Sequence, residues 1–147
     1  MTHLDHAAIW VADLDGARDF YSHWFNGHAN GLYENPVTGL RSHILHFCDD
    51  GVPDGRRARL EIMTRPDVLA SGGQAGLGWA HVSFAVPGPA DVDRLASDMA
   101  QAGIEVVDGP RLTGDGYYEA VVLDPEGNRV EIVAGDYSPE VALRPAP

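Results

Sequence analysis

The chain has 147 residues, of which 44% are hydrophobic and 22% charged, the composition of a soluble globular protein of one domain or two small fused modules. A net charge of −12 argues against nucleic acid as a partner, because an acidic surface repels phosphates. No apolar run reaches the roughly 20 residues that span a bilayer, which argues against a membrane protein. All ten basic residues are arginine, which excludes Schiff-base chemistry. The single cysteine, Cys48, and an N-terminus without a signal-peptide pattern predict a cytoplasmic protein.

The first half is predicted to run strand, helix and three strands. Residues 3–11 alternate in polarity, as a half-buried strand does. A helix is expected from Leu14 to Phe25, with Asp13 as its N-cap and Gly27 just after its end. Strands are then expected near residues 28–34, 41–48 and 57–63.

The second half repeats this order. A strand is expected over 79–86, a helix from Pro87-Gly88-Pro89 to about Ala102, and strands near 104–107, 117–123 and 128–134. We therefore divide the chain into a first βαβββ module (1–63), a linker (64–78), a second βαβββ module (79–136) and a tail (137–147). The fold class is α+β, with two such modules forming a cleft of curved mixed sheet.

Four residues occupy matched places in the two halves. His81 follows His6 by 75 positions (81 − 6), and Glu131 follows Glu61 by 70 (131 − 61). The helix-ending glycine also follows its histidine at nearly the same distance, 21 positions in one half and 22 in the other. The two halves thus agree both at the histidine and glutamate positions and at the glycine that ends the helix, which indicates an internal duplication.

The matched residues predict a metal site. A carboxylate within an apolar strand must be paired or must bind a cation, because an isolated buried charge is too costly. Alternation places each histidine and its glutamate on one sheet face. Two imidazoles and two carboxylates suit Zn²⁺, Ni²⁺, Co²⁺, Fe²⁺ or Mn²⁺. The metal ligands are therefore predicted to be His6, Glu61, His81 and Glu131.

A structural role for the same residues is the alternative. Arg59 and Arg129 each lie two residues before a predicted ligand glutamate, where an arginine can neutralise it. His43 and His46 point to opposite faces of one strand and cannot chelate together. The other histidines and Cys48 are interpreted as structural or solvated.

These features resemble the vicinal oxygen chelate superfamily, which includes glyoxalase I, bleomycin-resistance proteins, fosfomycin-resistance thiol transferases and extradiol dioxygenases. The resemblance covers about residues 3–134. It is carried by the segments around His6 and Asp19-Phe20-Tyr21, by Leu60-Glu61-Ile62 and 81–86, and most specifically by 124–132, Asp-Pro-Glu-Gly-Asn-Arg-Val-Glu-Ile.

The resemblance implies that His6, His81 and Glu131 are core ligands, and that Glu61 at the fourth position is similar to glyoxalase I. It further implies that Glu131 or Glu61 is catalytic and moves a proton while the metal holds an enediolate. Two positions depart from bacterial glyoxalase I. Trp10 stands where an arginine helps to bind glutathione, and Arg65 stands where an asparagine is found.

The first functional hypothesis is therefore a divalent-metal-dependent lyase or isomerase of glyoxalase-I type, acting on a small molecule such as a thiol adduct or a coenzyme A ester. The alternatives are a non-catalytic binding or resistance protein and an Fe²⁺ dioxygenase of extradiol type. Arg59, Arg65 and Arg111 are candidates for holding an anionic group of the substrate. The resemblance also favours a homodimer, with ligands from one subunit or from both.

Overall fold

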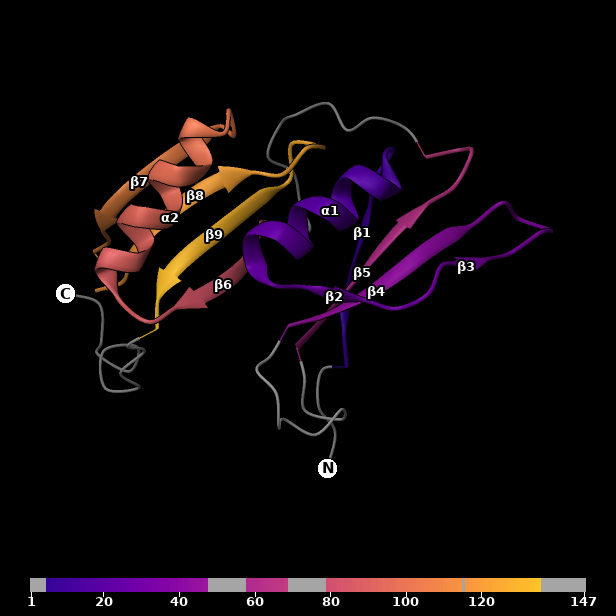
Figure 1. Cartoon of the computed structure of the whole chain (residues 1–147), viewed down its shortest axis with the longest axis horizontal. Coiled ribbons are helices and arrows are strands. Elements are labelled where there is room, and N and C mark those ends of the chain that lie inside the picture. The colour runs from indigo at the N-terminus through magenta and orange to yellow at the C-terminus, as the bar shows by residue number, and fades with distance from the viewer. Residues whose placement is uncertain (1–4, 48–57, 69–78, 115, 136–147) are drawn as a thin grey trace. The chain divides into compact units, whose positions relative to one another are not determined.

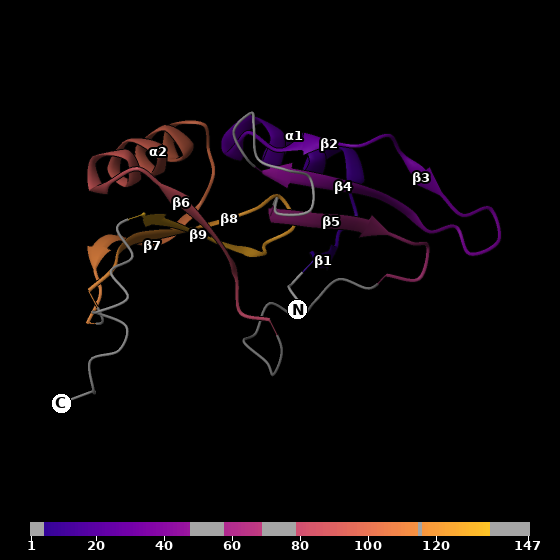
Figure 2. The same ribbon diagram turned by 90° about the horizontal axis from the view of Figure 1, so that it is seen from below.

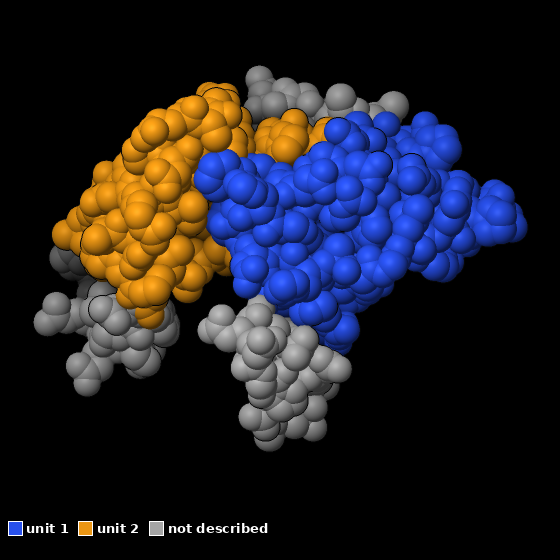
Figure 3. Space-filling model, in the orientation of Figure 1, with its two compact units in different colours: residues 1–74 blue, residues 75–147 orange. Residues whose placement is uncertain are grey.

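The computed structural model describes residues 5–47, 58–68, 79–114 and 116–135. The chain divides into two compact units, residues 1–74 and 75–147, which are coloured separately in Figure 3. Each unit contains one helix packed on one mixed sheet (Figure 1). Neither helix in the described ranges is long and apolar enough to cross a membrane.

The first unit follows the predicted order, with one helix between its first and later strands. Its elements are β1 (Ala7–Trp10), α1 (Leu14–Phe25), β2 (His28–Ala29), β3 (Tyr33–Glu34), β4 (Arg41–Phe47) and β5 (Ala58–Thr64). The sheet order is β1-β5-β4-β2, and β3 also pairs with β4. The first strand lies parallel to the last, and the other pairs are antiparallel.

The second unit has the same topology. Its elements are β6 (Val82–Val86), α2 (Pro89–Gln101), β7 (Val106–Leu112), β8 (Tyr118–Leu123) and β9 (Arg129–Ala134). The sheet order is β6-β9-β8-β7, and β6 again lies parallel to the last strand, β9. The prediction of an α+β fold built from two βαβββ modules is confirmed.

Each core forms between the helix and one face of its sheet (Figure 2). In α1, the side chains of Ala17, Phe20 and Tyr21 are buried at helical spacing. Alternate residues of the sheets are buried as well, among them Leu60 and Ile62 in the first unit and Val130 and Ile132 in the second. The residues between them, which include both predicted glutamate ligands, point to the opposite face.

The ends of α1 follow local chemistry. Asp13 is the N-cap as predicted, and its carboxylate accepts a hydrogen bond from the Gly16 amide at 2.9 Å. At the other end, the left-handed residue is Asn26 (φ 52°) rather than Gly27. Gly27 is needed for packing, because an added Cβ would lie 2.8 Å from Phe47 Cε1 and 3.0 Å from the Tyr21 carbonyl oxygen.

Several predicted strand bounds were wrong. β7 covers 106–112 instead of 104–107, with register shifts on both sides of Asp108 that absorb Gly109 and Pro110. The expected strand over 28–34 is two short strands, β2 and β3. β1 and β6 begin later than predicted, just after the histidines. Cys48, most of the predicted linker and the tail lie outside the described residues.

Candidate metal centre

The first unit brings one predicted histidine and one predicted glutamate together. Glu61 lies in β5 between two buried residues and points away from α1. Ala8 of β1 is its cross-strand partner, and His6 lies two residues earlier, toward the same face. His6 Nε2 is 3.6 Å from Glu61 Oε2.

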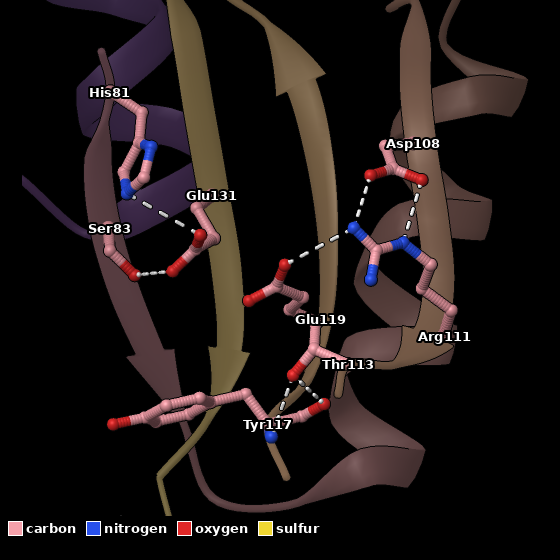
Figure 4. Close-up of polar contacts among 8 residues, drawn as sticks. All are labelled: His81, Ser83, Asp108, Arg111, Thr113, Tyr117, Glu119 and Glu131. Carbon is pink, nitrogen blue, oxygen red and sulfur yellow. Dashed lines mark hydrogen bonds and ion pairs between the residues drawn. The ribbon is translucent and has the colours of Figure 1, made fainter. Parts of the chain in front are cut away.

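The second unit repeats this arrangement. Glu131 lies in β9 opposite Ser83 of β6, and His81 lies two residues before Ser83. His81 Nε2 is 3.5 Å from Glu131 Oε2, as Figure 4 shows. The duplication seen in the sequence is therefore a duplication of side-chain geometry.

The two separations are too long for direct hydrogen bonds and are compatible both with ion pairs of protonated histidines and with ligands of a shared ion. A charge-assisted hydrogen bond between nitrogen and oxygen spans about 2.7–2.9 Å. Two ligand atoms at about 2.1 Å from one ion are about 3.0–3.4 Å apart for bond angles between octahedral and tetrahedral. The observed 3.6 and 3.5 Å lie nearer the second range. Imidazole nitrogen and carboxylate oxygen are also a donor set that divalent transition metals accept.

Each unit contains one such histidine–glutamate pair. The described residues contain no cluster of three or more histidine, cysteine, aspartate or glutamate side chains placed to hold an ion.

The arginines two residues before the glutamates do not neutralise them. Arg59 pairs with Asp5 through Nη2, and its Nε also donates to the Asp5 carbonyl oxygen at 3.4 Å. Across the described ranges, Arg129 forms no ion pair with Glu131. Both glutamates therefore remain available to a cation.

Asp5 is a site residue that the sequence analysis missed. Its carboxylate lies 2.8 Å from His6 Nδ1, so it can accept the Nδ1 proton and leave Nε2 as the free lone pair. The hydrogen bond from His6 lowers the pKa of Asp5, and the Arg59 guanidinium lowers it further. An aspartate directly before the histidine was the available signal.

Ser83 is a second residue that the sequence analysis missed. Its hydroxyl donates to Glu131 Oε1 at 2.6 Å, so the two oxygens of this carboxylate have different partners (Figure 4). Its position two residues after His81, on the same face, was the signal.

The remaining histidines lie outside both pairs. His43 is buried on the α1 side, with Nδ1 3.0 Å from the Asn30 carbonyl oxygen. His46 pairs in register with Arg59 and so lies on the opposite face, which confirms that these two histidines do not chelate together. The ring of His46 lies beside that of His28, with 5.6 Å between centroids.

The candidate anion-binding arginines all contact carboxylates. Arg111 donates to both oxygens of Asp108, and its Nη2 lies 3.8 Å from Glu119 Oε1 (Figure 4). The Arg111 guanidinium lowers the pKa of Asp108. Arg65 pairs with Asp67. These pairs reduce the charge that each arginine offers to a substrate.

The sequence matches the model of the Glyoxalase/Bleomycin resistance protein/Dioxygenase superfamily over residues 3–132. The chain belongs to this superfamily. No curated protein matches it by sequence.

Solved structures show the same fold at low identity. Glyoxalase I from Leishmania major, described as trypanothione-dependent, has a TM-score of 0.74 at 20% identity, with 97% of this chain and 93% of that chain covered. The fosfomycin resistance protein FosX from Listeria monocytogenes, solved with Mn(II) and sulfate, has a TM-score of 0.67 at 16% identity, with 98% and 99% covered. Lactoylglutathione lyase from Agrobacterium tumefaciens has a TM-score of 0.59 at 21% identity, with 92% and 95% covered.

Proposed function

We propose that this superfamily member is a divalent-metal-dependent lyase or isomerase of glyoxalase-I type. The observation that carries the proposal is the recurrence of one geometry. In each unit, a histidine just before one strand and a glutamate in the neighbouring parallel strand face one another, at 3.6 Å and 3.5 Å. Neither glutamate is paired with an arginine in the described ranges, which supports a role for both carboxylates in holding a cation.

In this proposal the four predicted ligands, His6, Glu61, His81 and Glu131, hold one ion of Zn, Ni, Co, Fe or Mn. When bound, the ion supplies positive charge that stabilises negative charge developing on substrate oxygens. Asp5 and Ser83 hold His6 and Glu131 in place. Glu131 or Glu61 removes a proton from one substrate carbon and returns it to the neighbouring carbon, while the hydroxyl proton of the first carbon's oxygen passes to the oxygen of the second, so the net reaction is an isomerisation.

The substrate is proposed to be a small oxygenated compound, such as a thiol adduct. Glutathione is not the favoured thiol, because Trp10 and Arg65 stand where the resemblance to bacterial glyoxalase I implies an arginine that helps to bind glutathione and an asparagine. The Arg65 guanidinium lies over the Trp10 ring, and Trp10 is 45% exposed. An exposed aromatic ring suits a flatter or more apolar thiol, or a coenzyme A ester, better than the γ-glutamyl carboxylate of glutathione.

A homodimer is part of the proposal. Since each unit supplies two ligands, a complete site needs one half-site of each kind. The halves come from one chain or are exchanged between two chains. Size-exclusion chromatography with light scattering at several protein concentrations measures the oligomeric state directly, and a monomer at all concentrations would contradict the dimer.

Two measurements test the activity. Elemental analysis of the purified protein should find about one divalent ion per complete site. A methylglyoxal assay should then show metal-dependent turnover with at least one thiol from a panel that includes glutathione, trypanothione, coenzyme A and small thiols. Bound metal without turnover on any thiol would reject the glyoxalase-type reaction, and no bound metal would reject metal-dependent catalysis.

A binding or resistance protein is the second candidate. It is favoured by two exposed aromatic side chains, Trp10 in the first unit and Trp79 in the second, which are 45% and 87% exposed. The elemental analysis separates the two candidates, because this alternative needs no ion.

A further inference from the structure

The duplicated halves differ in the residue that faces each glutamate. Ala8 lies opposite Glu61 in the β1–β5 register, and Ser83 lies opposite Glu131 in the β6–β9 register. Each of these residues stands two positions after its histidine, so the two places are equivalent. One place offers a hydroxyl to the carboxylate, and the other offers a methyl group.

The Ser83 hydroxyl forms a hydrogen bond with the glutamate that it faces. Ser83 Oγ donates to Glu131 Oε1 at 2.6 Å, a short hydrogen bond of the charge-assisted kind. The other oxygen, Oε2, is the one that faces His81 Nε2 at 3.5 Å. In the described ranges, Glu61 has an ion-pair contact with His6 and accepts no hydrogen bond from a facing side chain.

For the histidines, it is the first unit that supplies a polar partner and the second that does not. Asp5 directly precedes His6 and contacts its Nδ1 at 2.8 Å. Ala80 holds the equivalent place before His81 and has no polar side chain. Each half therefore fixes one of its two ligands: the imidazole in the first unit and the carboxylate in the second.

We propose that Ser83 is a positioning residue that holds the Glu131 carboxylate with Oε2 turned toward His81, in the orientation in which the pair would hold an ion. Glu61 faces Ala8 and receives no hydrogen bond from it. In the proposal, the bound ion or substrate therefore sets the orientation of the Glu61 carboxylate. The inference rests on the proposed function, because it assumes that these glutamates are metal ligands. Its physical basis is that a ligand held in its bound orientation loses less conformational freedom when the ion arrives.

The test exchanges the two facing residues and measures ion affinity by calorimetry, with Mn²⁺, Ni²⁺ and Zn²⁺ each titrated into the metal-free full-length protein. Ser83→Ala should weaken binding about tenfold, at the low end of the effect of residues that hold a ligand. Ser83→Thr, which keeps the hydroxyl, should bind within about twofold of the wild type. Ala8→Ser, the matched variant in the other half, should bind at least as tightly as the wild type, because it adds a donor beside Glu61.

The outcomes are separable. If the wild type binds none of the three ions, the proposed function fails and this inference with it. If the wild type binds but Ser83→Ala binds equally well, only the role of Ser83 is overturned. A loss that Ser83→Thr does not restore, or an equal loss in Ala8→Ser, would show that the effect is general disturbance of the sheet and would also overturn the role. Urea unfolding of each variant checks that the fold is intact. Because Ser83 is exposed, the unfolding midpoint of the Ser83 variants should equal that of the wild type.

Discussion

The guanidinium of Arg65 lies over the indole ring of Trp10, with 5.3 Å between Cζ and the ring centroid. These are the two positions where the resemblance to bacterial glyoxalase I implies a glutathione-binding arginine and an asparagine. Trp10 pairs in register with Met63, which shares a sheet face with Glu61. Trp10 and Arg65 therefore contact one another on the sheet face that carries His6 and Glu61. Together they alter the groups with which this face could contact a substrate.

A first prediction concerns the choice of thiol. The double variant Trp10→Arg/Arg65→Asn restores both glyoxalase-type residues and should raise kcat/KM for the glutathione adduct of methylglyoxal by about tenfold or more, the value of one charge-assisted hydrogen bond. Steady-state kinetics with several thiols measures the change. Trp10→Ala, which removes the ring without adding a cation, is the control and should give no gain for glutathione.

A second prediction concerns Glu131. Glu131→Gln removes the charge and one basic oxygen while keeping the shape, and should lower turnover by at least about a hundredfold. The far-ultraviolet circular dichroism spectrum should not change. Glu119→Gln is the matched control, because Glu119 lies on the same face of the same sheet beside Arg111. Full activity in Glu131→Gln would show that the catalytic assignment is wrong.

A third prediction concerns Asp5. Asp5→Ala removes the acceptor of the His6 Nδ1 proton and should weaken metal binding by about 10- to 100-fold. It also frees Arg59, which lies on the same face as Glu61 and is then able to compete with the ion. The double variant Asp5→Ala/Arg59→Ala separates the two effects, since any recovery of affinity measures the competition by Arg59.

The control for this third prediction removes a carboxylate elsewhere. Asp91→Ala breaks an exposed pair with Arg94 and changes the net charge by the same amount. Its metal affinity, measured by the same titration, should equal that of the wild type. An equal loss in both variants would mean that net charge, and not the orientation of His6, sets the affinity.

A fourth prediction concerns Gly27 and the packing of α1. Gly27→Ala places a Cβ 2.8 Å from Phe47 Cε1 and 3.0 Å from the Tyr21 carbonyl oxygen, and should destabilise the protein by about 1–3 kcal/mol. Gly31→Ala is the control, because no atom lies within 4 Å of its added Cβ. Urea unfolding should show a lower midpoint for the first variant and an equal or higher one for the second.

The sequence by itself determined the order of elements, the family and the four candidate ligands. Helix α1 was predicted from Leu14 to Phe25 because its apolar spacing and the Asp13 cap are local signals. Alternation indicated which residues of each strand share a face with Glu61 or Glu131. The contacts of His6 with Glu61 and of His81 with Glu131 also needed the parallel registers of β1 with β5 and of β6 with β9. The internal duplication predicted only that the two halves would share their geometry.

Only the tertiary structure decided which partner each of these side chains has. Asp5 was missed as the partner of His6, and Arg59 was expected near Glu61 but pairs with Asp5. The contact of Ser83 with Glu131 likewise depends on the parallel register of β6 with β9. The Arg59–Asp5 and Ser83–Glu131 contacts join residues far apart in the chain, and a register shift of one residue would remove them, so no local pattern specifies them.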